Sequence, residues 1–210
     1  MKLQEILTPF YMDALKEMGN VGAGNAATAL SRMTGRRIDV AVSKVTVLPL
    51  PAVADFLGGR EQDVAAVYLP MQGDVNGKVL LFFPLEGVPG LLSILAGTKD
   101  VDPANLGDLE VSALKEVGSI MTGSYLGALS RFIHLTLIHG VPDFTLDMAQ
   151  AVLDSVLVEL EQNDDLVIVI ETEMSEADRL ISGHFLLFPE AGSVEKIFRA
   201  FSQALGLSQG

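Results

Sequence analysis

Hydrophobic residues recur every three or four positions along one stretch near the start of the chain. They stand at Tyr11, Ala14, Leu15, Met18, Val21, Ala26, Ala29, Leu30 and Met33. This spacing is typical of an amphipathic helix and not of a strand, in which hydrophobic and polar residues alternate. Pro9 suits the first turn of a helix, and Gly35 suits the left-handed turn that ends many helices. The pattern therefore predicts a long helix from about Pro9 to Thr34.

The opposite face of this predicted helix carries short polar residues. Steps of about 100° per residue place one stripe there, formed by Asp13, Glu17, Asn20, Gly24, Ala27 and Ser31. Near the middle of the stripe, only Glu17 and Asn20 carry a long or amide-bearing side chain. Because they are three positions apart, both side chains point the same way.

The same pattern returns 99 residues later, between Ser112 and Arg131. Ten of the twenty aligned positions are identical, and Glu17 is matched by Glu116. Asn20 is matched by Ser119, which is a conspicuous difference. A solvated helix face gives no reason for a repeated Glu, Gly and Ser in register, so the repeat predicts a function for the stripe. Asp108 begins the second helix, which is expected to end near His134.

Shorter elements fill the rest of each half. Strands are expected at 37–42 with an extension over 45–49, and at 64–69, 78–83, 136–138, 166–172 and 183–188. Shorter helices are expected at 86–96, 146–153 and 194–205. A second match supports the duplication: at a spacing of 105 residues, Leu81, Phe83, Pro84 and Gly87 are matched by Leu186, Phe188, Pro189 and Gly192.

The predicted fold class is α+β, an α/β sandwich with a pseudo-twofold duplication. Neither helix face can be buried by its own half alone, so the two halves must share one core. We expect a single domain over 1–210, made of two repeats at about 10–99 and 108–205. Two long helices would pack on a mainly antiparallel sheet, because the strands follow one another in hairpins.

Composition excludes several functions. The net charge is −13, which disfavours binding to nucleic acid or to an anionic membrane surface. There is no Cys, so disulfides, zinc–thiolate sites and thiol nucleophiles are absent. The three His residues lack the spacing of metal ligands, and no metal site is expected. No signal peptide and no run long enough to span a bilayer is found, which predicts a cytoplasmic protein without membrane insertion.

The glycines within the first helix need an explanation, because each costs a helix about 1 kcal/mol relative to Ala. Gly22, Gly24 and Ala27 have the spacing of a dinucleotide-binding loop, but that loop should follow a strand and open a helix. Two other interpretations stay open. The glycines allow close helix packing, or Gly24 and Ala27 clear the stripe so that another protein can approach Glu17 and Asn20.

A Glu and an Asn without a nucleophile or a metal can still promote one kind of reaction. The carboxamide of Asn can donate to and accept from a water molecule, and so orient it for attack. Gln has this role in some phosphoryl-transfer enzymes. Glu can pair with a cation on a partner. Such chemistry requires a partner that brings its own phosphoryl group and metal.

Asp13-x-x-x-Glu17-x-x-Asn20 and Ser112-x-x-x-Glu116-x-x-Ser119 resemble the duplicated motif of the CheC/CheX/FliY phosphatases of bacterial chemotaxis. The resemblance is strongest to CheC-type members and covers essentially the whole chain. It implies a hydrolase in signal transduction that acts on the aspartyl-phosphate of a CheY-like response regulator. In that case Asn20 aligns the attacking water, and Glu17 pairs with the regulator's active-site lysine. The regulator supplies Mg²⁺, and this chain needs no cofactor of its own.

The resemblance also implies a second site, formed by Glu116 and Ser119, that is degenerate. Family members with two working sites carry Asn where this chain has Ser119, and a hydroxyl reaches less far than a carboxamide. Asp13, Gly24 and Ser112 would face the docked regulator.

A second partner implied by the resemblance is CheD, a receptor-modifying glutamine deamidase. The segment around Asp147 resembles the CheC helix linked to CheD contact, and an ordinary half-buried helix with a surface Asp is the alternative. The alternative for the whole chain is a non-catalytic or weakly catalytic binding module that sequesters CheD or the phosphorylated regulator.

Overall fold

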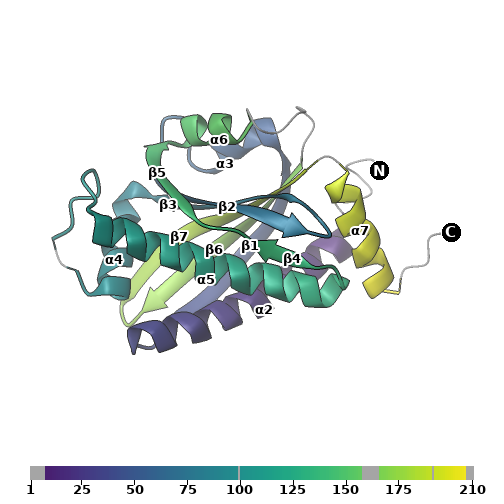
Figure 1. Ribbon diagram of the computed structural model, residues 1–210, viewed down its shortest axis with the longest axis horizontal. Helices are drawn as coiled ribbons and strands as arrows, with labels where there is room; N and C mark the ends of the chain where they lie inside the picture. The colour runs from purple at the N-terminus through teal and green to yellow at the C-terminus, as the bar shows by residue number, and fades with distance from the viewer. Residues whose placement is uncertain (1–7, 99, 158–165, 191, 207–210) are drawn as a thin grey trace.

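The computed structural model describes residues 8–98, 100–157, 166–190 and 192–206. Its helices and strands, labelled as in Figure 1, are α2 (Pro9–Thr34), β1 (Asp39–Pro49), η1 (Leu50–Ala52), α3 (Val53–Phe56), β2 (Asp63–Gly73), β3 (Gly77–Pro84), η2 (Leu85–Gly87), α4 (Val88–Ala96), α5 (Asp108–Ile133), β4 (Leu137–His139), β5 (Asp143–Met148), α6 (Ala149–Leu157), β6 (Leu166–Glu176), β7 (Arg179–Pro189) and α7 (Ser193–Ala204).

Both long helices lie where the hydrophobic spacing predicts them. Thr8 precedes α2 in an extended conformation, and Pro9 occupies its first turn. Gly35 ends the helix with a φ of 68°, and His134 ends α5 in the same left-handed region. The predicted boundaries of the two helices are therefore confirmed.

One seven-stranded sheet forms the centre of the molecule, in the order β1-β6-β7-β3-β2-β4, with β5 also paired to β2. Every pairing among the described strands is antiparallel. Figure 1 shows α2 and α5 along one side of the sheet, α3 and α6 on the other side, and α4 and α7 at opposite ends. The predicted fold, an α+β sandwich with two long helices on an antiparallel sheet, is confirmed.

Each face of the sheet has its own hydrophobic core. The larger core joins the sheet to α2, α4, α5 and α7, and includes Leu30, Val67, Leu114 and Phe201. The smaller core joins the other face to η1, α3 and α6. Since both faces are covered, the central strands are hydrophobic on both sides: β3 is buried from Gly77 through Phe83.

The strand order reflects an exchange between the two halves of the chain. β1 follows the first long helix but pairs with β6 of the second half. β4 and β5 follow the second long helix but pair with β2 of the first half. The pairing β1–β6 thus corresponds to β5–β2, with β7 and β3 side by side at the centre. The division into two repeats within one domain stays a prediction, which this pairing pattern supports.

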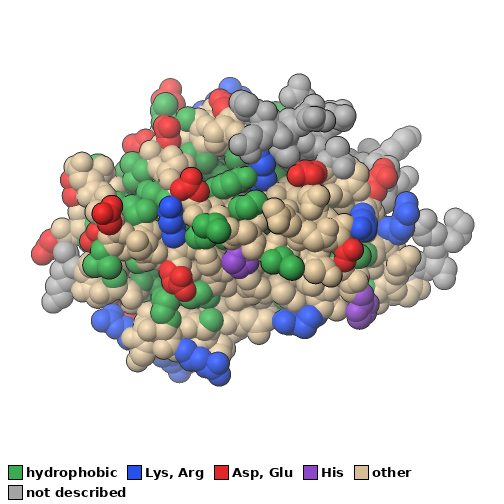
Figure 2. Space-filling model, viewed as in Figure 1, with side chains coloured by type: hydrophobic (Ala, Val, Ile, Leu, Met, Phe, Trp, Pro, Cys, Tyr) green, Lys and Arg blue, Asp and Glu red, His purple; other side chains and the backbone are tan. Residues whose placement is uncertain are grey.

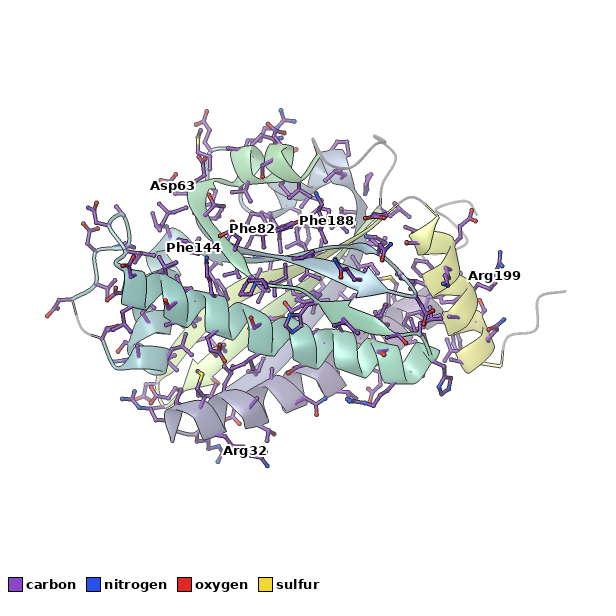
Figure 3. The ribbon with its side chains drawn as sticks, viewed as in Figure 1. Arg32, Asp63, Phe82, Phe144, Phe188 and Arg199 are labelled. Atoms are coloured by element: carbon purple, nitrogen blue, oxygen red, sulfur yellow. The ribbon has the colours of Figure 1, made fainter. Side chains whose placement is uncertain are left out.

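The central strands show that the 105-residue spacing is wrong by one residue. Phe83 belongs to the larger core, whereas Phe188, its expected counterpart, belongs to the smaller core. A spacing of 106 matches Phe82 with Phe188, and both lie in the smaller core (Figure 3). The same spacing matches Gly77 with Gly183, and their contacts agree with it. A Cβ on Gly77 would contact the Phe188 carbonyl oxygen, and a Cβ on Gly183 would contact the Phe82 carbonyl oxygen.

The region from Leu146 to Leu153, predicted as helical throughout, changes from strand to helix at Ala149. Leu146 pairs with Ala65, and the Ala149 amide donates to the Gln62 carbonyl oxygen over 2.8 Å. Pairing with β2 therefore overrides the helical spacing of the hydrophobic residues here. The short helices η1 and α3, which together extend from Leu50 to Phe56, were not predicted from the sequence.

The two long helices cross at Gly22, which is buried against α5. A Cβ at Gly22 would lie 2.5 Å from Cδ1 of Tyr125 and 3.0 Å from its Cα. Tyr125 has little freedom to move, because its hydroxyl lies 3.0 Å from Oγ1 of Thr172 and its ring packs on Phe185 with centroids 4.8 Å apart. Burial raises the pKa of Tyr125 to about 12. Close packing therefore explains Gly22.

We predict that Gly22→Ala and Gly24→Ala have opposite effects on stability. Gly22→Ala should lower the free energy of unfolding by about 1–3 kcal/mol, because the added methyl group collides with Tyr125. Gly24→Ala should raise it by up to about 1 kcal/mol, because no atom lies within 4 Å and Ala favours the helix. Urea unfolding of both variants measures this. Equal effects would show that the crossing is not a tight contact.

Candidate functional site

The stripe on α2 faces away from the core, and its central residues are exposed. Asp13, Glu17, Asn20 and Gly24 are all exposed, while Leu15, on the other face of the helix, is buried. Within the described parts of the chain, neither Glu17 nor Asn20 makes a hydrogen bond or an ion pair. Both side chains are therefore available to a molecule that approaches from solvent.

The two other glycines of this segment have different surroundings. A Cβ on Gly19 would lie 3.3 Å from a methyl carbon of Val42, so Gly19 allows the helix to lie close to β1. A Cβ on Gly24 would meet nothing within 4 Å. Packing accounts for Gly19, as it does for Gly22, but not for Gly24. The open surface at Gly24 agrees with the interpretation that this position leaves room for a partner.

Ser31, the last member of the predicted stripe, has a structural role instead. It is half-buried, its hydroxyl donates to the Ile38 carbonyl oxygen over 3.1 Å, and it accepts from the Ile38 amide over 2.9 Å. Its counterpart Ser130 donates to the Leu135 carbonyl oxygen over 2.6 Å. The repeated serine therefore bonds the last turns of each long helix to the segment that follows the helix. This structural role explains why the serine is repeated, and no role at the exposed face is needed.

The second half presents a similar but altered stripe on α5. Glu116 is exposed, and Ser119 is half-buried. The hydroxyl of Ser112 donates to the Asp108 carbonyl oxygen of its own helix over 2.6 Å. The Ser119 hydroxyl has no hydrogen-bond partner among the residues that the structure describes. Each helix thus brings together its own predicted site residues, and no described hydrogen bond or ion pair joins the two sets.

An ion pair distinguishes the second site from the first. Lys115 Nζ lies 3.1 Å from Oδ1 of Asp143 on β5. The Phe144 amide and then Lys115 donate to this carboxylate and lower the pKa of Asp143. At the first site the matching residue, Lys16, is exposed and has no ion-pair partner within the described ranges. Among the described residues, the lysine that precedes Glu17 in the sequence therefore has no ion-pair partner, whereas the lysine that precedes Glu116 has one.

A residue that the sequence analysis set aside lies beside the second stripe. His139 of β4 is half-buried, and its Nδ1 lies 3.0 Å from the Gly140 carbonyl oxygen. Its Nε2 lies 3.2 Å from the place of a Cβ on Gly123, one helical turn after Ser119. The sequence carries no signal for this contact, because spacing alone does not show which strand passes beside α5.

Asp147 lies apart from both stripes. It is exposed on β5 opposite Val64, and its carboxylate accepts from the Met148 amide over 2.8 Å. The expectation that Asp147 is part of a helix is wrong, because α6 begins two residues later. Its acidic group nevertheless stays exposed just before that helix.

The first site is an exposed surface and not a pocket. A cavity of about 240 Å³ lies elsewhere, between α6 and strands β2, β3 and β5, and is lined by residues of the smaller core such as Ala66, Leu80 and Val156. Figure 2 shows hydrophobic side chains gathered on the visible face between α6 and α5. A surface without a cavity suits a large partner better than a small substrate.

Neither a metal site nor a membrane span is found in the described parts of the chain. No group of three or more His, Asp or Glu residues there is placed to hold a metal ion. No described helix is both long enough and hydrophobic enough to cross a bilayer.

Comparisons with known proteins show which sequences and structures this chain resembles. Residues 10–42, which contain the first stripe, match the model of the CheC-like family. The chain is 35% identical over 198 residues to the CheY-P phosphatase CheC of Bacillus subtilis, covering 92% of this chain and 95% of that protein. It is 28% identical over 126 residues to the flagellar motor switch phosphatase FliY of Bacillus subtilis, covering 59% of this chain and 32% of that protein.

Among solved structures, FliY of Thermotoga maritima superposes with a TM-score of 0.74 and 23% identity, covering 95% of this chain and 99% of that one. This likeness concerns the fold. The identity to the Bacillus subtilis phosphatase extends over nearly the full length of both chains. The chain therefore belongs to the CheC family.

Proposed function

We propose that this protein is a phosphatase that hydrolyses the aspartyl-phosphate of a CheY-type response regulator. The observation that carries the proposal is the exposed pair Glu17 and Asn20, which points to solvent from one face of a rigid helix and has no partner among the described residues. The relative from Bacillus subtilis named as a CheY-P phosphatase supports the same reaction. A protein-sized substrate fits the open surface at Gly24.

In the proposed reaction the carboxamide of Asn20 holds a water molecule in line with the phosphorus atom. Its oxygen accepts from the water and its NH₂ group donates, so one side chain can fix both position and orientation. The water attacks phosphorus, the bond to the regulator's aspartate breaks, and inorganic phosphate leaves. Orientation is the main contribution, since an aspartyl-phosphate is already reactive.

Glu17 serves to dock the regulator. Its carboxylate pairs with the lysine of the regulator's active site, a charge-assisted contact that also fixes the distance between Asn20 and the phosphoryl group. In this proposal the Mg²⁺ that would neutralise the phosphoryl oxygens belongs to the regulator, and no group of residues in the described parts of this chain is placed to hold a metal ion. Asp13 lies one turn before Glu17 and borders the same contact surface.

The alternative is a binding module that sequesters the regulator with little hydrolysis. Ser119 favours this alternative for the second site, because a hydroxyl cannot orient water as a carboxamide does. Asn20 favours catalysis at the first site. We therefore assign most of the activity to the first half.

We also propose that the junction of β5 and α6 contacts a CheD-like deamidase. Asp147 is exposed there, and the neighbouring Met148 has 44% of its surface exposed. Methionine is enriched at protein interfaces, and a carboxylate at the polar rim can pair with a cation of the partner.

Asn20→Ala should slow dephosphorylation of the regulator by about a hundredfold, because water is no longer oriented at the first site. Ser119→Ala should change the rate by less than about threefold in the parent, because the second site contributes little. Phosphate release from a phosphorylated CheY-type regulator measures both. A larger loss from Ser119→Ala than from Asn20→Ala would contradict the assignment of the main site.

Gly24→Gln should keep the fold and lower the activity. The side chain enters open solvent, so stability should not fall, but it covers the surface that the regulator must approach, and the rate at low substrate should drop by about tenfold or more. Asn25→Gln, on the adjacent exposed position outside the stripe, is the matched control. Full activity of Gly24→Gln would mean that the regulator docks elsewhere.

Asp147→Lys should weaken capture of a CheD-like deamidase by about tenfold, because it reverses a charge at the proposed contact. Asp178→Lys makes the same change in the exposed turn between β6 and β7 and is the control. Pull-down with the deamidase from the same organism compares the two variants. Equal capture by both would exclude Asp147 from the interface.

A further inference from the structure

The second site has gained an imidazole where the first has a hydrophobic side chain. Ile38 and Leu135 follow the paired serines and are 97 positions apart, as are Val42 and His139. The strand pairing gives the same match. The register of β1 shifts just after Val42, and the second half is interrupted at the corresponding place, between β4, which ends at His139, and β5. The half-buried His139 therefore replaces the buried Val42.

The hydrogen bond of His139 determines which ring nitrogen is free. Nδ1 lies 3.0 Å from the Gly140 carbonyl oxygen, which can only accept, so Nδ1 carries the proton in the neutral ring. Nε2 then has an unshared electron pair. It lies against Gly123, where a Cβ would come within 3.2 Å. The absence of a side chain at Gly123 therefore leaves room for the imidazole at the surface of α5.

Ser119 stands one helical turn before Gly123, on the same stripe as Glu116. Its hydroxyl has no described partner, whereas the hydroxyls of Ser112 and Ser124 donate to carbonyl oxygens of their own helix. A free hydroxyl and a basic nitrogen thus border the same short length of α5. The Cβ positions of residues one turn apart, here Ser119 and Gly123, are roughly 6 Å apart. Nε2 of His139 lies close to the second of these positions, so there is space for a water between Nε2 and the hydroxyl.

We propose that Ser119 and His139 together hold and deprotonate the attacking water at the second site, in place of the carboxamide that the first site uses. This inference rests on the proposed phosphatase function. The water donates one proton to Nε2 of His139 and attacks the phosphorus of the regulator's aspartyl-phosphate. The bond from phosphorus to the aspartate oxygen breaks, and its electron pair stays on the carboxylate. Inorganic phosphate leaves, and the imidazolium returns its proton to solvent.

The test uses the full chain with Asn20→Ala, so that hydrolysis at the first site is removed. This variant should still dephosphorylate a CheY-type regulator, in Mg²⁺, faster than the regulator loses phosphate alone. Adding His139→Val, the residue of the first half, should remove that excess, a fall of about tenfold or more. His139→Gln retains a polar side chain but has no basic nitrogen, and should behave in the same way.

Two further measurements separate a chemical role from a structural one. Free imidazole should restore part of the activity to Asn20→Ala with His139→Ala, which it could not do for an unfolded protein. Asn20→Ala with His134→Asn, a change at an exposed histidine after α5, should behave like Asn20→Ala alone. Thermal unfolding of each variant checks the fold.

The proposal is overturned if Asn20→Ala with His139→Val or His139→Gln keeps the rate of Asn20→Ala. It is also overturned if Asn20→Ala alone is no faster than the free regulator. Failure of the phosphatase function itself looks different, because the parent with Asn20 intact would then have no effect on the regulator.

Discussion

The contact between Gly22 and Tyr125 sets the orientation of both long helices. On α2, Gly22 is turned about 200° from Asn20, so holding Gly22 against α5 directs Asn20 and Glu17 to solvent. On α5, Tyr125 is turned from Glu116 in a similar way and holds the second stripe outward. A water-orienting amide must be fixed within a fraction of an ångström to be useful. The buried crossing provides that rigidity without occupying the exposed face.

The two long helices could be predicted from the sequence alone. A stretch as long as α2 contains several helical turns, so many hydrophobic positions together indicate which face is buried, although Val21 and Met33 are exposed in the structure. The repeat at α5 supports the same grouping of residues. The placement of Glu17, Asn20, Glu116 and Ser119 on their helices could be predicted because each pair lies within one helix, where sequence spacing determines geometry directly.

The register of the strands could not be predicted in this way. β3 is buried on both sides, so its sequence carries no alternation from which a face can be read. A one-residue error then moves a side chain to the opposite face, and Phe83 was matched to Phe188 in place of Phe82. The prediction of a helix over Leu146–Leu153 was wrong in its first part for a related reason. The hydrophobic residues do have helical spacing, but the first residues of this region pair with β2 and form a strand.

Half of the twenty aligned positions in the two long helices differ, yet several structural features around them recur in both halves. Three features recur in both halves: the hydrogen bonds that Ser31 and Ser130 make to the segments after their helices, the strand pairing, and the close contacts of Gly77 and Gly183. Against this background, the replacement of Val42 by His139 stands out, because it changes both the chemistry and the helix contact: Val42 lies against Gly19, and His139 lies against Gly123. A duplicated fold thus provides an internal reference.

This reference also limits what the second site can be. The Lys115–Asp143 pair uses the cation that the first site leaves free, so a regulator would meet a different charge pattern at each stripe. Since electrostatic complementarity governs encounter more than final affinity, the two sites should differ first in how fast they capture a partner. In the proposed function both this ion pair and the change to Ser119 reduce the contribution of the second half. Among the described residues, only the first half combines the amide of Asn20 with a lysine, Lys16, that has no ion-pair partner.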